Sequence, residues 1–264
     1  MSKEFAPAVY FIGAGPGAPD LITLRGHRIL AQADLVLYAD SLVPKQMLAH
    51  CQAGAELIPT GSKTLEEILP LMINGVKQGK IVVRLQSGDL TLYSAVQEQI
   101  RRLAEAEIPL ECVPGISAFQ ALGASLNREL TLPDLVQTII LTRLSGAASA
   151  VPERENLASL AAHRASLALY LAARQAETAQ AQLLEHYPPE TAVAIAFRLG
   201  WPDEQIWLAP LKDMAAVSRR ENLIRTTLYL ISPALNGLLD PDSEPERRSQ
   251  LYHPQHRHLF RPRP

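Results

Sequence analysis

A run of small residues, Gly-Ala-Gly-Pro-Gly-Ala at positions 13–18, directly follows the first apolar segment of the chain, residues 8–12. Glycine loops after a strand let backbone N–H groups approach a phosphate, and this spacing fits the dinucleotide fingerprint. Asp40 lies where that fingerprint places the acidic residue that binds a ribose, about twenty residues on. A dinucleotide-dependent oxidoreductase is therefore one candidate function.

Two prolines in and beside this run argue against a pyrophosphate site. Pro16 and Pro19 have no N–H group, so each removes a donor that a phosphate would need. The helical pattern begins only around Thr23, so the glycines do not abut the helix N-terminus that the fingerprint requires. Such a loop is better suited to the close approach of another backbone or a flat ligand, and a tight turn without a ligand is the further alternative.

Composition limits the other classes of function. The 264 residues carry a formal net charge of -2, which argues against an overall basic, nucleic-acid-binding surface. No apolar run is long enough to span a bilayer, and we expect a cytoplasmic protein without a membrane partner. The chain has only two cysteines, Cys51 and Cys112, which give no sign of a disulfide framework and indicate a reducing compartment. The spacing of His253, His256 and His258 matches no closed zinc site, so we expect no metal.

Short buried strands alternate with helices along the whole chain, which predicts an α/β protein with two α/β domains and mainly parallel sheets. The predicted strands are residues 8–12, 35–38, 81–85, 136–141, 165–171, 191–197 and 226–231. The predicted helices are residues 23–33, 65–77, 94–105, 155–163, 177–186 and a turn at 211–216. We place the N-terminal domain at 1–114, the C-terminal domain at 115–239 and an irregular tail at 240–264.

Several segments, taken in order, resemble the tetrapyrrole methylases. Residues 10–23 are similar to the first loop of that family, residues 84–93 to its second loop and residues 113–118 to its domain junction. Residues 142–143 with 151–153, 201–204, and 251–254 with 258–261 are similar to one branch. That branch methylates C-11 of a corrin precursor, precorrin-4 or its cobalt form, in cobalamin biosynthesis.

The resemblance implies S-adenosyl-L-methionine as the methyl donor, bound in a cofactor cleft between the two domains, and a homodimer. It implies that the donor is contacted by Pro16, Ser87, Gly88, Asp89, Leu92, Ser117, Ala118, Leu171 and Gly200. Asp89 has a second interpretation as a turn-capping aspartate after a strand, and Leu171 has one as a core residue. Methyl transfer needs no nucleophilic side chain, and we assign no catalytic residue.

The implied acceptor is a small-molecule tetrapyrrole that carries many carboxylates, which arginines recognise well. Arg84, Arg143 and Arg198 lie at or just after predicted strands and are our candidates for binding it, with Tyr93.

The chain also departs from the family pattern. Leu90 replaces a usual proline, Ser94 a glycine and Gly200 a branch serine, and residues 147–150 differ from the branch. Methylation at another macrocycle position and a non-catalytic tetrapyrrole-binding relative therefore remain alternatives, and the sequence does not say whether the acceptor carries cobalt.

Overall fold

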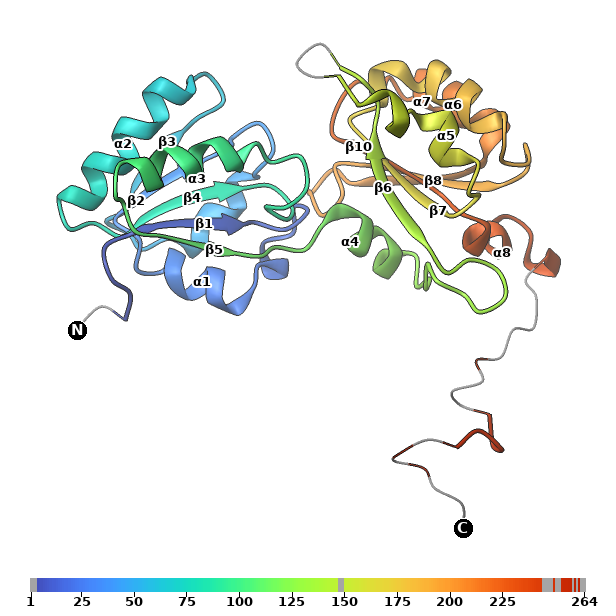
Figure 1. Cartoon of the computed structure of the whole chain (residues 1–264), viewed down its shortest axis with the longest axis horizontal. Helices are drawn as coiled ribbons and strands as arrows, with labels where there is room; N and C mark the ends of the chain where they lie inside the picture. Colours follow the sequence, from blue (N-terminus) through green and yellow to red (C-terminus); the bar gives the residue numbers. More distant parts are fainter. Residues whose placement is uncertain are drawn as a thin grey trace. The chain divides into compact units, whose positions relative to one another are not determined.

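The computed structural model describes residues 4–146, 150–243, 249, 253–257, 259 and 261. The chain forms two compact units (Figure 1). The N-terminal domain contains the residues up to Leu122 together with Arg198–Glu204, and the C-terminal domain contains Gly123–Phe197 and the chain from Gln205. The sequence predicts a division after residue 114, whereas the two compact units divide between Leu122 and Gly123, inside helix α4 (Ala118–Ser125).

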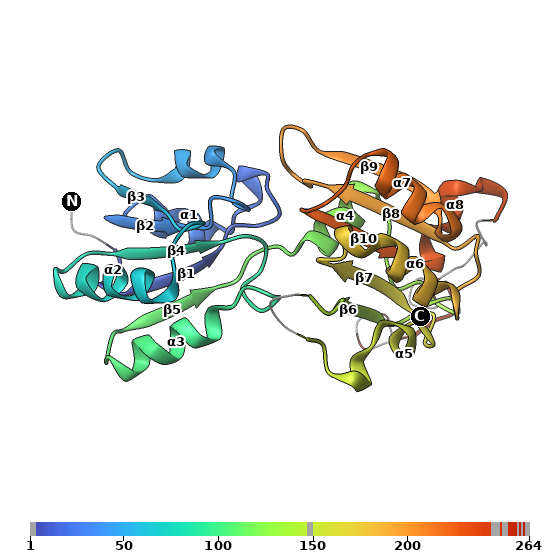
Figure 2. The same ribbon diagram turned by 90° about the horizontal axis from the view of Figure 1, so that it is seen from above.

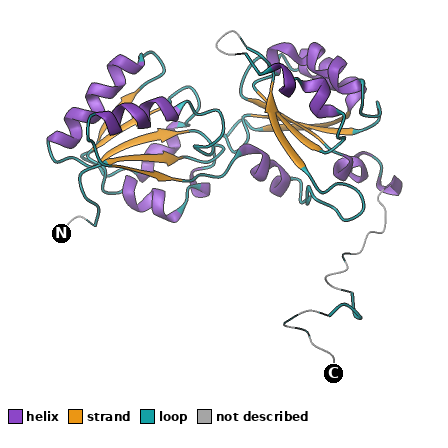
Figure 3. Cartoon of the chain, viewed as in Figure 1, coloured by secondary structure: helices purple, strands orange, loops and turns teal. Residues whose placement is uncertain are grey.

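The sheet of the N-terminal domain is entirely parallel, as predicted, with the strand order β3-β2-β4-β1-β5 (Figure 2). Its strands are β1 (Val9–Gly13), β2 (Leu35–Tyr38), β3 (Glu56–Pro59), β4 (Val82–Gln86) and β5 (Leu110–Val113). The three central strands β2, β4 and β1 are fully buried, since helices cover both faces of the sheet (Figure 3). Their near-continuous apolar runs are what a parallel sheet of this kind requires.

Helix α1 (Leu24–Leu30) covers one face of this sheet, and α2 (Leu65–Lys77) and α3 (Val96–Glu105) cover the other (Figure 1). Successive residues of β1 point to opposite faces, so Ile12 packs in the core on the α1 side and Phe11 in the core on the α2 and α3 side. The side chain of Thr23 accepts a hydrogen bond from the Gly26 N–H and caps α1, in agreement with a helix predicted to begin around Thr23.

The sheet of the C-terminal domain has the order β6-β7-β10-β8-β9. Its strands are β6 (Ile139–Arg143), β7 (Ser166–Tyr170), β8 (Ala192–Phe197), β9 (Gln205–Pro210) and β10 (Thr227–Ile231). Only β6 and β7 pair in parallel, while β7–β10, β10–β8 and β8–β9 are antiparallel, so the prediction of a mainly parallel sheet needs correction here. For β8 and β9 the physical reason is that the connection Arg198–Glu204 is too short for a crossover and forms a hairpin.

Helices α5 (Leu157–Ala161), α6 (Ala176–Leu184) and α7 (Met214–Arg220) contribute to one apolar core with strands of this sheet. A short helix, α8 (Asn236–Leu239), follows β10. None of the helices in the described residues is long and apolar enough to cross a membrane. The branch-like segments at 251–252, His258 and Phe260, and the variant residues 147–149, lie outside the described residues.

Candidate functional site

Three loops leave the N-terminal sheet at the same end of its strands. This is because β4, β1 and β5 are parallel neighbours and their carboxyl ends lie side by side. The chain goes from β1 to α1 on one face of the sheet and from β4 to α3 on the other (Figure 1). Neighbouring strands whose connections diverge in this way leave a crevice beyond their carboxyl ends, which is where open α/β sheets bind ligands. The edge formed by these three loops is therefore the candidate site.

The three loops meet at glycine backbones. A Cβ atom added to Gly115, after β5, would lie 2.1 Å from the carbonyl oxygen of Gly88, after β4. A Cβ atom on Gly13, at the end of β1, would lie 2.6 Å from that same oxygen and 2.6 Å from the nitrogen of Gly115. No residue other than glycine fits at Gly13 or Gly115 without moving the backbone, so the main chain itself forms the floor of the site.

Backbone N–H groups of the first loop are hydrogen-bonded to the end of β4 and to the second loop. The N–H of Ala14 donates to the Gln86 carbonyl at 2.7 Å, and Gly15 and Gly88 exchange N–H···O bonds of 3.2 and 2.7 Å. Gly15 and Gly88 both have positive φ, +78° and +67°, which suits glycine. Because these N–H groups are already bonded and α1 starts only at Leu24, the loop does not form the phosphate cradle that a dinucleotide needs.

Asp89 links the second loop to the junction loop. Its Oδ2 accepts from the N–H of Gly115 at 3.0 Å, and its Oδ1 accepts from the N–H of Thr91 at 2.9 Å and from the Thr91 hydroxyl. Burial raises the pKa of the Asp89 carboxyl, but hydrogen bonds from Thr91, Gly115 and Leu90 outweigh it and leave the pKa lowered. The turn-capping interpretation of this aspartate therefore describes real contacts, and a negative charge is held at the site.

The rest of the second loop is partly exposed. Ser87 and Leu92 are half-buried, and Tyr93 is exposed with a left-handed φ of 55°. Leu90, which stands where the family usually has proline, is buried in the core with α2 and α3. The leucine side chain at this position is therefore used in packing the N-terminal core.

The junction loop ends in a helix cap. Ser117 is buried, and its backbone N–H donates to the side-chain Oε1 of Gln120 at 3.0 Å. A serine with glutamine three residues on is the pattern of a capping box, so the spacing of Ser117 and Gln120 could have predicted the start of α4 at Ala118. This cap fixes the direction in which the chain leaves the site.

A fourth segment of the N-terminal domain, Arg198–Glu204, packs on the first loop. Gly200 has a φ of +77°, and a Cβ atom there would lie 2.5 Å from the nitrogen of Ala18. A Cβ atom on Gly17 would lie 2.5 Å from Cδ1 of Trp201. The sequence analysis assigns Gly200 to the site, but no spacing signal indicates the contact of Trp201 with Gly17.

Eight of the nine predicted donor contacts thus belong to the N-terminal domain, on the three loops and on Arg198–Glu204: Pro16, Ser87, Gly88, Asp89, Leu92, Ser117, Ala118 and Gly200. The ninth, Leu171, belongs to the C-terminal domain and follows β7. It has a φ of 56° and its surface is 68% exposed, so it is not a core residue. Its exposure and strained backbone therefore rule out the interpretation of Leu171 as a core residue and leave the predicted donor contact as a hypothesis.

The structure does not place Arg84 where an acceptor could reach it, contrary to the sequence interpretation. Arg84 is 5% exposed, and its guanidinium donates to the side chains of Gln99 and Thr60 and to the Leu37 carbonyl. Burial lowers its pKa to about 10. It lies on the same face of β4 as Val82, which α2 and α3 cover, so its role is structural.

The other two candidate arginines are half-buried. Arg143, the last residue of β6, donates to the carbonyls of Leu144 and Ala150 at 3.1 and 3.4 Å. Arg198 places its guanidinium carbon 4.1 Å from the ring centroid of Trp201 and forms an ion pair of 2.9 Å with Asp203. Arg198 therefore already has partners within its own loop.

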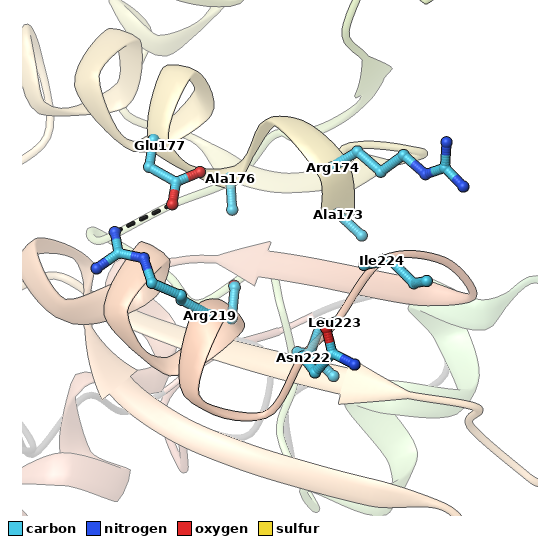
Figure 4. Close-up of a pocket in the computed structure, with 9 residues that line it drawn as sticks. Ala173, Arg174, Ala176, Glu177, Arg219, Asn222, Leu223 and Ile224 are labelled. Atoms are coloured by element: carbon cyan, nitrogen blue, oxygen red, sulfur yellow. Dashed lines mark hydrogen bonds and ion pairs between the residues drawn. The ribbon is translucent and has the colours of Figure 1, made fainter.

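A separate hollow of about 330 Å³ lies in the C-terminal domain between the start of α6 and the end of α7 (Figure 4). Glu177 and Arg219 form an ion pair of 3.0 Å across it, and Arg174 points away from that pair. None of the predicted site residues lines this hollow. Within the described residues, no group of three His, Cys, Asp or Glu side chains could hold a metal ion.

Comparison with known proteins agrees with the resemblance seen in the sequence. The model of the family described as Tetrapyrrole (Corrin/Porphyrin) Methylases matches residues 8–215. A precorrin-4 C(11)-methyltransferase of Pseudomonas aeruginosa is 43% identical over 256 residues, which cover 96% of this chain and 98% of that protein.

Two solved structures share the fold. The X-ray structure of a cobalt precorrin-4 methyltransferase matches with a TM-score of 0.83 and 39% identity, over 87% of this chain and 96% of that one. A uroporphyrin-III C-methyltransferase from Thermus thermophilus, solved in complex with S-adenosyl homocysteine, matches with a TM-score of 0.72 and 25% identity. That match covers 86% of this chain and 98% of the other.

Proposed function

Since the chain belongs to the tetrapyrrole (corrin/porphyrin) methylase family, we propose that it methylates C-11 of precorrin-4 or its cobalt form, with S-adenosyl-L-methionine as donor. The observation that carries the proposal is the meeting of the loops after β1, β4 and β5 at Gly13, Gly88 and Gly115. Relatives named for this reaction cover nearly the whole chain, which supports the C-11 position over other positions of the macrocycle.

The residues at this edge fit a sulfonium donor better than a pyrophosphate. The N–H groups of Ala14 and Gly15 are already bonded, so they do not offer an anion site. The lowered pKa of Asp89 keeps a negative charge beside the loops, which is favourable for a cationic ligand. When bound, S-adenosyl-L-methionine supplies a methyl group that is already activated by its positively charged sulfur.

The protein then has two tasks, to align the acceptor carbon with the methyl group and to exclude water. We propose that the backbone at Pro16, at Gly88 and at Ala118, the first residue of α4, holds the donor and that exposed Leu171 contributes an apolar contact from the C-terminal domain. None of these side chains needs to act as a nucleophile, because the leaving group is the neutral thioether of the donor.

We propose Arg143 and Tyr93 as the contacts for the carboxylate-rich acceptor. Arg143 ends a strand and is half-buried, and Tyr93 is exposed on the second loop beside Leu92. The ion pair and ring contact of Arg198 reduce its freedom to bind a carboxylate, although its side chain is 33% exposed. Arg84 is not part of this proposal because it is buried.

Calorimetry with S-adenosylhomocysteine and with NADH tests the ligand class directly. We expect the thioether to bind and NADH to give no heat of binding. Binding of NADH alone would contradict the proposal and restore the oxidoreductase alternative.

Incubation with methyl-labelled donor and a precorrin-4-generating mixture tests the reaction. We expect label at C-11, located by NMR. Label at another carbon would identify a different macrocycle position, and binding of the thioether without transfer would identify a non-catalytic relative. Parallel reactions with the metal-free and the cobalt-containing acceptor separate the two acceptor forms.

We also propose that the enzyme works in the cytoplasm as a homodimer, as the resemblance implies. Light scattering coupled to size exclusion tests the dimer, since it gives the mass of the particle against 28.9 kDa for one chain. A monomer at assay concentration would contradict it.

A further inference from the structure

We infer that Trp201 is a positioning residue that holds the donor-binding loop at Pro16 and Gly17 in its working conformation. The inference deepens the proposed function and rests on it, because the loop matters to catalysis only if it contacts the donor. It also assigns a role to a tryptophan that no sequence signal connected with the site.

The contact between Trp201 and the first loop leaves no free space. A Cβ atom on Gly17 would lie 2.5 Å from Cδ1 of Trp201 and 2.6 Å from the carbonyl oxygen of Leu199. The backbone of Gly17 is therefore packed directly against the edge of the indole, and Pro16 precedes this contact in the chain. A loop pressed against a rigid ring cannot move toward it, so the indole sets one limit of its position.

The indole is itself held by its own segment. The guanidinium carbon of Arg198 lies 4.1 Å from the centroid of the ring, within the range of a cation–π interaction. Arg198 is fixed in turn by its 2.9 Å ion pair with Asp203, and the backbone N–H of Trp201 donates to the Arg198 carbonyl at 2.9 Å. The contacts that hold the indole of Trp201 against Gly17 therefore all lie within Arg198–Glu204 and do not involve the first loop.

The indole nitrogen provides a second observation. Nε1 of Trp201 is buried and has no hydrogen-bond partner among the described residues. Buried donors are nearly always bonded, so this one calls for an explanation. Nε1 is covalently bonded to Cδ1, the atom that faces Gly17. The indole N–H group therefore lies at the edge of the ring nearest the loop. Changes in that loop on ligand binding should therefore alter the environment of the indole and its fluorescence.

Two substitutions of Trp201 and one matched control test the role. We expect Trp201→Ala to weaken binding of S-adenosylhomocysteine by roughly tenfold or more, equivalent to about 1.4 kcal/mol. KM for the donor should rise while KM for the tetrapyrrole stays near its wild-type value. Trp201→Phe keeps an aromatic ring and should recover most of the affinity. Trp207→Phe removes the other tryptophan, which packs on the C-terminal core, and should bind as wild type.

Fluorescence gives a readout that does not require Trp201 to be removed. In the Trp207→Phe protein, Trp201 is the only tryptophan, and we expect its emission to change on saturation with S-adenosylhomocysteine. Unchanged emission while calorimetry detects binding would overturn the inference, as would wild-type affinity in folded Trp201→Ala. If the wild-type protein fails to bind the thioether at all, the proposed function fails instead, which calorimetry on the unmodified chain shows first.

Discussion

The carboxylate of Asp89 accepts a hydrogen bond from the backbone N–H of Gly115, with 3.0 Å between Oδ2 and the nitrogen. Asp89 follows β4 and Gly115 follows β5, and β1 lies between these strands in the sheet. The hydrogen bond therefore joins the loops after β4 and β5, and the loop after β1 lies between them. It connects the backbones of the candidate site through the side chain of Asp89.

Asp89→Asn should weaken this connection without changing the size of the side chain. The amide keeps one oxygen, but it loses the negative charge and places an NH2 group toward one of the N–H donors. We expect the free energy of unfolding to fall by about 1.5–3 kcal/mol, the range for hydrogen bonds to charged groups, and the affinity for S-adenosylhomocysteine to fall with it. Denaturant unfolding and calorimetry measure the two effects. Asp213→Asn is the control, since its exposed side chain caps no helix; an equal loss there would contradict the explanation.

The lowered pKa of Asp89 predicts a particular acid dependence. Its hydrogen bonds to Thr91, Gly115 and Leu90 depress the folded-state pKa below the ordinary value of 3.8, despite the opposing effect of burial. The stability it contributes is therefore complete above that ordinary value and is lost as the pH falls through the folded-state pKa. The stability difference between wild type and Asp89→Asn should shrink on acidification from about pH 6 to about pH 3. Urea unfolding across that range measures it, and a constant difference would rule out the linkage.

The meeting of three glycine backbones predicts a severe effect of a single methyl group. Gly115→Ala would place its Cβ 2.1 Å from the Gly88 carbonyl oxygen, and backbone cannot move aside as a flexible side chain can. We expect a loss of stability of about 2 kcal/mol or more, together with loss of donor binding, because strain and misplaced loops act together.

Gly54→Ala is the matched control for this substitution. A Cβ atom there would meet nothing within 4 Å, and Gly54 has no positive φ. We expect it to be neutral or to stabilise the protein by up to about 1 kcal/mol through the unfolded state. Thermal unfolding of both variants gives the comparison, and equal melting temperatures would show that the glycine contacts are unimportant.

The central strands were predictable and several edge strands were not. Central strands β1, β2 and β4 are buried on both faces, so each is an apolar run in the sequence. The strands that the sequence did not predict, β3, β5 and β9, are all at sheet edges, where exposed residues such as Glu56 and Cys112 interrupt the pattern. Strand direction was also hidden, because a buried strand has the same composition whether it runs parallel or antiparallel.

The loops of the candidate site, whose positions depend on backbone contacts, were predictable from the sequence. The side chains whose positions depend on which face of a strand they occupy were not. The glycine and proline spacing marked the loops that meet at Gly13 and Gly88, because few other residues allow such backbone contacts. The prediction that Arg84 binds the acceptor was wrong. In a sheet covered by helices on both faces, the alternation of side chains along a strand does not show which of them points to a ligand. The contact of Trp201 with Gly17 joins residues far apart in the sequence, and local patterns carry no information on it.

Arg84 and Arg143 should respond differently to the same conservative change. Arg84→Lys cannot preserve the bonds to Gln99, Thr60 and Leu37, and it buries a strongly hydrated ammonium, so we expect a loss of about 2 kcal/mol or more in stability. In the folded fraction, KM for the tetrapyrrole should be unchanged. Arg143→Lys should leave stability within about 0.5 kcal/mol and raise KM for the tetrapyrrole. The opposite pattern would return Arg84 to the acceptor site.

Leu171 combines an exposed apolar side chain with a left-handed backbone, and these two features predict opposite effects of Leu171→Gly on stability and binding. Glycine adopts a φ of 56° without the steric cost that leucine bears, and a side chain that is 68% exposed has little packing to lose. We expect unchanged stability or a gain of up to about 1 kcal/mol, with weaker binding of S-adenosylhomocysteine. Leu171→Asn, which also tolerates this backbone, should behave in the same way. A loss of about 2–5 kcal/mol would mark a core leucine instead, and wild-type affinity in both variants would remove Leu171 from the donor site.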